Sequence, residues 1–167
     1  MAHRDVKLEN IMITHNYEVK LIDMGMFSSL VGTAKTGFYA SKKGTPQYMC
    51  PEVHKGMPYQ GSDADLFATF VALFIMRVFR YPFQAAISKG GNADYNYYCL
   101  QRSDTKEYWE MFDETPSTEF KRIIEVMLQE DPNARLTMVD VIGHEWMVQP
   151  TASAEQFKEK YQSIIGN

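Results

Sequence analysis

Several features are scarce or missing in this sequence of 167 residues, and each scarcity excludes a class of protein. The two cysteines, Cys50 and Cys99, are too few for a disulfide framework and have no metal-binding spacing. No apolar run reaches the ~20 residues that a membrane-spanning helix needs, and no signal-like segment opens the sequence. We therefore expect an intracellular protein without a membrane partner, cytoplasmic, with the nucleus also open to it.

A strong charge excess and a glycine-rich phosphate loop are also missing. The formal net charge is -4 and the 17 basic residues are dispersed, so the sequence predicts no nucleic-acid partner. Neither G-x-G-x-x-G nor G-x-x-x-x-G-K-[ST] occurs in the 167 residues. The hydrophobic content of 45% suffices for one buried core, and no repeat or low-complexity segment divides the chain.

The amino end does contain a set of residues suited to phosphoryl transfer. Moving a phosphoryl group to a hydroxyl needs a proton acceptor, oxygen ligands for Mg²⁺ and a cation near the transferred group. Asp5 can accept the proton and Lys7 can supply the cation. Asn10 and Asp23 offer oxygen atoms to a hard cation. Two strand-like runs, 11–14 and 18–22, flank a polar turn, so a hairpin is expected to return Asp23 to the loop.

Three motifs in order carry a resemblance to the protein kinase family. H-R-D-V-K-L-E-N at 3–10 resembles the catalytic loop H-R-D-x-K-x-x-N, and D-M-G at 23–25 resembles the metal motif D-F-G. G-T-P-Q-Y-M-C-P-E at 44–52 resembles G-T-x-x-Y-x-A-P-E, with Cys50 in place of Ala. Lysine two residues after the aspartate is typical of the serine/threonine branch, and we identify a resemblance to calcium/calmodulin- and AMP-activated-type kinases over residues 3 to about 148.

The resemblance implies an enzyme that transfers the gamma-phosphate of ATP to serine or threonine of a protein substrate, with Mg²⁺. Asp5 would be the catalytic base, and Lys7 and Asn10 would complete the catalytic set. Asn10 and Asp23 would bind the metal, and together with Lys7 they would hold the ATP phosphates. Glu9 resembles the acidic residue that meets a substrate arginine, whereas Ile75 replaces the second acidic residue, so the substrate preference stays open.

The same resemblance makes residues 23–52 an activation segment. Arg4 would pair with a phosphate placed there by an upstream kinase, because a guanidinium binds a phosphate in a bidentate manner. Ser41 is the candidate phosphorylation site, with Thr36 as an alternative and an unmodified polar loop as a third possibility. Thr45 resembles the threonine that bridges the base and the catalytic lysine.

Three further residues have structural roles by the same resemblance. Glu52 and Arg135 would form a buried ion pair that ties the activation segment to the helices, and Asp65 would hold the backbone of the catalytic loop. Two departures stand out, Met24 in place of Phe in the metal motif and Phe70 in place of Gly.

Periodicity predicts mainly helical structure after residue 60. An apolar helix over 64–78, opened by Ser62, is expected at the centre. A one-sided apolar stripe from Phe120 to Leu128 predicts a second helix that starts at 116–117. Thr137 with Asp140 and Ser153 with Gln156 form the starts of two later helices. Residues 84–116 either carry a docking helix or cover the core. The last helix either packs on the parent domain or binds a partner.

The expected fold is therefore mainly α, a kinase-like carboxyl-terminal lobe built around a buried central helix, with a small antiparallel β-ribbon. We expect residues 1–148 to form this lobe, without the amino-terminal lobe that cradles the nucleotide, and residues 149–167 to form a linker and an amphipathic helix. Such a fragment is expected to be inactive alone. The alternatives are a pseudokinase-like docking module without catalysis and a truncated piece without an independent function.

Overall fold

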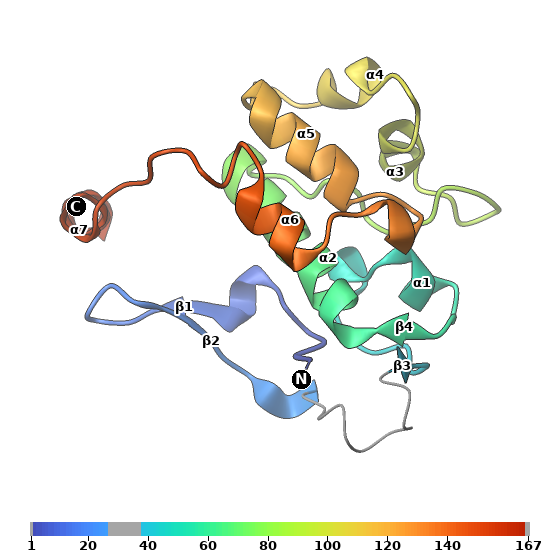
Figure 1. Ribbon diagram of the computed structural model, residues 1–167, viewed down its shortest axis with the longest axis horizontal. Helices are drawn as coiled ribbons and strands as arrows, with labels where there is room; N and C mark the ends of the chain where they lie inside the picture. The colour runs from blue at the N-terminus through green and yellow to red at the C-terminus, as the bar shows by residue number, and fades with distance from the viewer. Residues whose placement is uncertain (1, 27–37, 166–167) are drawn as a thin grey trace.

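Helices dominate the computed structural model, which describes residues 2–26 and 38–165 (Figure 1). The central element is α2, Gly61–Val78, whose large buried side chains include Phe67, Phe70 and Phe74. The prediction of a buried helix is confirmed, but the predicted start at Ser62 is wrong. Gln60 is the N-cap, and the Ser62 hydroxyl donates to Asp63 instead. No helix within the described ranges is long and apolar enough to cross a membrane.

The first residue of α2 must be a glycine because the side chains of Ala2 and Tyr39 leave no room for a Cβ atom. A Cβ atom at Gly61 would lie 2.3 Å from Cβ of Ala2 and 2.8 Å from the ring of Tyr39. A side chain there would displace the segment that leads into the catalytic loop, so this contact joins the amino end to the central helix.

Several of the remaining helices pack around α2. The predicted stripe forms α5, Thr118–Met127, in which Phe120, Ile123, Ile124 and Met127 are buried. The aromatic residues of the 84–116 region form α3, Tyr95–Leu100, and α4, Lys106–Trp109. Phe74 of α2 contacts the rings of Tyr108, Trp109 and Phe112 at centroid distances of 6.2, 5.8 and 5.1 Å. This region therefore covers the core. The shorter helices are α1, Pro51–His54, and the 3₁₀ turns η1, Leu8–Asn10, η2, Met24–Met26, η3, Pro46–Tyr48, and η4, Pro132–Ala134.

The predicted hairpin is confirmed. Strands β1, Ile11–Ile13, and β2, Val19–Leu21, pair antiparallel with Ile11 opposite Leu21, and the ribbon projects away from the helices (Figure 1). A second, unpredicted ribbon pairs β3, Phe38–Tyr39, with β4, Tyr59–Gln60. It holds residues 38–39 beside the start of α2.

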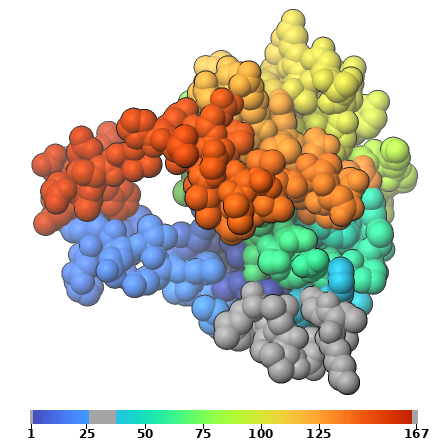
Figure 2. All heavy atoms as spheres, viewed as in Figure 1, coloured from blue at the N-terminus to red at the C-terminus, as the bar shows by residue number. Residues whose placement is uncertain are grey.

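Two capped helices end the chain. Thr137 and Asp140 form the predicted capping box of α6, Met138–Gly143. Ser153 and Gln156 exchange hydrogen bonds of 2.9 and 3.2 Å at the start of α7, Ala154–Ile165. In Figure 2, α7 (red) lies against the hairpin (blue) at one side of the molecule rather than on the central helices.

Candidate active site

The loop at residues 3–7 is held by a carboxylate from the central helix. The Asp65 oxygens accept hydrogen bonds of 2.7 Å from the backbone N–H groups of His3 and Arg4. Arg4 has a φ of 70°, a left-handed conformation that disfavours a residue with a side chain, so these bonds hold a strained backbone. Burial raises the pKa of Asp65 and the two backbone bonds oppose that rise only in part.

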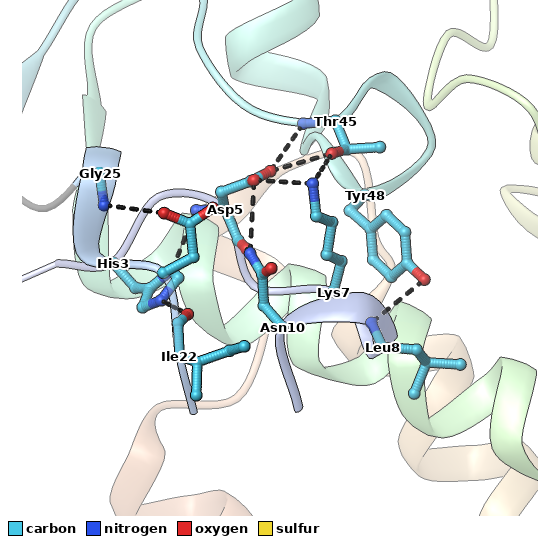
Figure 3. Close-up of polar contacts among 10 residues, drawn as sticks. His3, Asp5, Lys7, Leu8, Asn10, Ile22, Gly25, Thr45 and Tyr48 are labelled. Carbon is cyan, nitrogen blue, oxygen red and sulfur yellow. Dashed lines mark hydrogen bonds and ion pairs between the residues drawn. The ribbon is translucent and has the colours of Figure 1, made fainter. Parts of the chain in front are cut away.

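Asp5 lies at the centre of the site and makes contacts with both carboxylate oxygens (Figure 3). Its Oδ1 accepts from the backbone N–H and the hydroxyl of Thr45 at 3.0 and 2.9 Å. Its Oδ2 lies 2.9 Å from Nζ of Lys7, which also donates to the Thr45 hydroxyl at 3.0 Å. The structure thus brings Asp5, Lys7 and Thr45, which are 40 residues apart at the extremes, into one cluster.

The charges of this cluster stabilise each other. Burial raises the pKa of Asp5, but the hydrogen bonds from Lys7 and Thr45 and the positive charge of Lys7 outweigh burial, so that the pKa falls below its usual value. The hydrogen bond to Asp5 raises the pKa of Lys7 against the effect of burial, and the charges of Asp5, Glu9 and Asp23 add to the rise. Both groups are therefore charged at neutral pH, as a proton acceptor and a phosphate-screening cation require.

The hairpin carries the two expected metal ligands. Asn10 is buried, and its Nδ2 donates to the Asp5 carbonyl oxygen at 2.9 Å, which leaves the amide oxygen to act as a ligand. The Ile22 N–H donates to the Asn10 carbonyl at 2.8 Å, and this bond brings Asp23 back beside the loop. His3 reinforces the closure, since its Nε2 lies 2.9 Å from the Ile22 carbonyl oxygen (Figure 3).

Asp23 completes the set at the end of the second strand. It is exposed, has a φ of 64°, and accepts a hydrogen bond of 3.1 Å from the Gly25 N–H. Among the described residues no group of three or more His, Cys, Asp or Glu side chains could hold a metal ion. A donor set of one carboxylate and one amide oxygen fits Mg²⁺ best, because Mg²⁺ takes few protein ligands and completes its shell with phosphate oxygens and water.

Arg4 and Ser41 meet at the end of the activation segment. Nη2 of Arg4 donates to the Ser41 hydroxyl, and the guanidinium lies 4.5 Å from the centroid of the Tyr39 ring. The Tyr59 hydroxyl holds the Ser41 carbonyl at 3.1 Å. In the part of the chain that the structure describes, the buried Nε of Arg4 has no hydrogen-bond partner. Thr36 lies outside the described residues.

Glu52 and Arg135 form a bidentate pair below the site. Nη1 and Nη2 of Arg135 lie 2.7 and 2.8 Å from Oε1 and Oε2 of Glu52. The Glu52 side chain is 7% exposed and the Arg135 side chain 4%. Arg135 also donates to the Gln129 carbonyl at 2.9 Å and lies over the Phe67 ring. This pair binds the end of the activation segment to the segment that follows α5.

Sequence reasoning did not single out two residues of the site. Tyr48 accepts a hydrogen bond of 3.4 Å from the Leu8 N–H, and burial raises its pKa to about 12. His3 links the catalytic loop to the second strand. Both occupy motif positions, the tyrosine of 44–52 and the histidine of 3–10, so the motifs contained the signal although the contacts could not be inferred from them.

Comparison with known proteins places this geometry in a family. The family model described as protein kinase domain matches residues 1–147. Serine/threonine-protein kinase chk1 of Schizosaccharomyces pombe is 32% identical over 152 residues, which cover 90% of this chain and 29% of that protein. NUAK family SNF1-like kinase 1 of Homo sapiens is 31% identical over 147 residues, 88% of this chain and 20% of that protein.

A third relative is a plant protein kinase. CBL-interacting protein kinase 5 of Oryza sativa subsp. japonica is 28% identical over 144 residues, which cover 86% of this chain and 29% of that protein. The chain thus spans less than a third of the length of each of these three relatives. The match runs through the catalytic loop, the metal motif and the activation segment, and the chain belongs to the protein kinase family, with serine/threonine kinases of the SNF1-like and CBL-interacting types among its relatives.

Proposed function

We propose that this chain provides the catalytic and metal-binding half of a serine/threonine kinase that transfers the gamma-phosphate of ATP to protein hydroxyls. The observation that carries the proposal is the cluster of Asp5, Lys7 and Thr45, with the Asn10 amide oriented by the Asp5 backbone. An ordinary solvated turn would not contain a buried, ionised aspartate whose two carboxylate oxygens contact a lysine and a threonine.

In the proposed reaction each residue has a physical task. The ionised Asp5 orients the substrate hydroxyl and accepts its proton, because its lowered pKa keeps the carboxylate free of a proton of its own. Lys7 screens the charge of the transferred phosphoryl group. Asn10 and Asp23 would hold Mg²⁺, which supplies further neutralisation of the phosphate charge when bound. Glu9, exposed beside the cluster, lies where a basic substrate residue would approach.

The nucleotide cradle has to come from residues other than these 167. We propose that residues 1–148 form the carboxyl-terminal lobe and 149–167 a linker and helix. Exposed apolar side chains of the hairpin and of η2 support a covering lobe, with Val19 at 64% and Met24 at 57% exposed. A groove of about 370 Å³ between α2 and α6, lined by Phe70, Met138 and other residues, supports a further helix packed there.

We propose phosphorylation of Ser41 by an upstream kinase as the activating event. Its hydroxyl already meets Arg4, and the unpartnered Nε of that arginine supplies a further donor for a phosphate oxygen. A phosphate at Ser41 would therefore stabilise the segment that supplies Thr45 to the catalytic cluster. The two free thiols and the ATP requirement fit an intracellular protein.

A chimera tests the proposed function. The residues of NUAK family SNF1-like kinase 1 that precede its match to this chain would supply both the nucleotide lobe and the further helix. Joined before His3, they should give a protein that phosphorylates serine or threonine peptides in the presence of Mg²⁺. Asp5→Asn should lower kcat by about 100-fold to 10,000-fold, the range for loss of a general base. Asp23→Ala should raise the Mg²⁺ requirement or abolish activity. A folded chimera that binds ATP but transfers no phosphate would instead favour a docking module without catalysis.

A further inference from the structure

The carboxyl-terminal helix contacts the turn of the catalytic hairpin at Tyr17. Its ring packs edge-on against Tyr161 of α7 with centroids 5.8 Å apart. Its hydroxyl accepts a hydrogen bond of 2.8 Å from Nε2 of Gln162, and Nζ of Lys158 lies 5.5 Å from the ring centroid. These three contacts come from successive turns of one helix face, and the Phe157 ring stacks behind Tyr161.

The backbone at this turn presents Tyr17 to α7 in a costly conformation. Tyr17 has a φ of 63°, in the left-handed region that favours glycine or asparagine. The turn is closed by hydrogen bonds of 2.9 Å from the Tyr17 N–H to Thr14 and from the Thr14 N–H to Glu18. A bulky residue held in this conformation needs compensating contacts, and α7 supplies them.

The opposite end of the same hairpin carries the expected metal ligands. The bond from the Ile22 N–H to the Asn10 carbonyl closes the hairpin directly before Asp23. Each strand is three residues long, and Met12, Val19 and Leu21 are exposed. A two-stranded ribbon this short is marginal by itself, so an added contact at its turn changes how often the ribbon opens.

We propose that Tyr17 is a positioning residue through which α7 stabilises the turn of the hairpin and so holds Asn10 and Asp23 in register. We call the contacts of Tyr17 with α7 the strap. The ligand role of these two residues rests on the proposed function, whereas the strap itself does not. The C-terminal helix is then neither a cover for the central helices nor a free tail, but a support for the metal-binding end of the site.

Hydrogen exchange followed by NMR tests the strap without nucleotide. Tyr17→Ala removes the ring while keeping the Cβ atom and the strain of the left-handed conformation, and Gln162→Ala removes the hydrogen bond from the other side. Glu159→Ala, an exposed position of α7 outside the three contacts, is the matched control. We expect the Ile22 amide to exchange on the order of fivefold faster in both variants, with the control and the α2 amide of Val71 unchanged.

Two results would overturn the strap. The Ile22 amide could exchange at the wild-type rate in Tyr17→Ala, or exchange could rise equally at Ile22 and Val71, which would make α7 a source of general stability only. In the active chimera, Tyr17→Ala should raise the Mg²⁺ concentration for half-maximal rate and leave the peptide KM unchanged. An unchanged Mg²⁺ requirement would refute the positioning role. An inactive wild-type chimera would count against the proposed function, while the exchange result would still decide the strap.

Discussion

At the scale of the residue, backbone strain in the described part of the chain is concentrated at and near the site. Four non-glycine residues in ranges 2–26 and 38–165 have a positive φ: Arg4, Tyr17, Asp23 and Phe79. Arg4 is held by Asp65, Tyr17 by α7, and Asp23 lies between the hairpin and the Gly25 N–H. Each left-handed residue lowers the free energy of unfolding by roughly 1–2 kcal/mol. At these three positions the protein is less stable, and the strained backbone determines where the side chains lie.

Phe79 has no such compensation and provides the first prediction. It caps the C-terminus of α2 with a φ of 59°, and its side chain is 77% exposed. Phe79→Gly should stabilise the protein by about 1 kcal/mol, because glycine adopts this conformation freely and little buried area is lost. For a chain of this size the thermal midpoint should rise by about 2–4 °C. Phe79→Ala is the control, since it removes the ring but keeps the strain, and an equal rise there would contradict the explanation.

Asp5 provides a prediction about pH. Its pKa is lowered on folding, so its contribution to stability is full above the unfolded value of 3.8 and is lost as the pH falls through the folded value. Asp5→Asn should therefore lose less unfolding free energy than the wild type between about pH 6 and pH 3. Urea unfolding at the two pH values measures this difference. An equal loss in both proteins would show that the contacts of Asp5 with Lys7 and Thr45 do not stabilise the ionised form.

At the scale of the element, the helices predicted from the sequence agree with the structure where burial determines the pattern of apolar residues. The nearly continuous apolar run of α2, the one-sided stripe of α5 and the capping boxes of α6 and α7 were all predictable, because each depends on local spacing. The start of α2 was not, because contacts of Gly61 with Ala2 and Tyr39 decide it rather than a local cap. The ribbon of β3 and β4 has two residues per strand, too few to show an alternation.

The position of α7 also could not be predicted from the sequence. Periodicity shows that Phe157 and Tyr161 share a face, but it does not show which surface that face meets. The contact with Tyr17 joins residues more than 140 positions apart and depends on the geometry of a turn. Long-range contacts of this kind need the assembled structure.

The ion pair between Glu52 of α1 and Arg135 gives the prediction at this scale. Arg135→Ala should destabilise the protein by about 3–5 kcal/mol, because the buried Glu52 would lose its partner. Chemical denaturation measures the change. Asp113→Ala is the matched control, since it breaks the exposed pair with Arg80 and should change stability by less than about 0.5 kcal/mol. Equal effects of the two substitutions would contradict the structural role of the buried pair.

At the scale of the whole molecule, the proposed function requires a nucleotide-binding part in addition to the residues described above. Asp5, Lys7, Asn10, Asp23 and Thr45 were named from motif and spacing, and the resemblance also implied that Asp65 holds the backbone of the loop. The bonds of Tyr48 and His3 required the three-dimensional arrangement. The exposed apolar faces of the hairpin and of the groove between α2 and α6 indicate where further structure would pack. In the proposed function, the catalytic residues lie on this part and the nucleotide cradle on another, so activity would depend on their assembly.

Calorimetric titration of ATP with Mg²⁺ into the folded 167-residue chain tests this central claim most directly, with Asp23→Ala as the control. We predict no micromolar binding to either protein, because these residues include metal ligands but no phosphate cradle. Circular dichroism must first show the expected helical structure in both proteins. Micromolar binding by the chain that disappears in Asp23→Ala would contradict the claim, since it would mean that this half of the kinase holds the nucleotide without a second lobe.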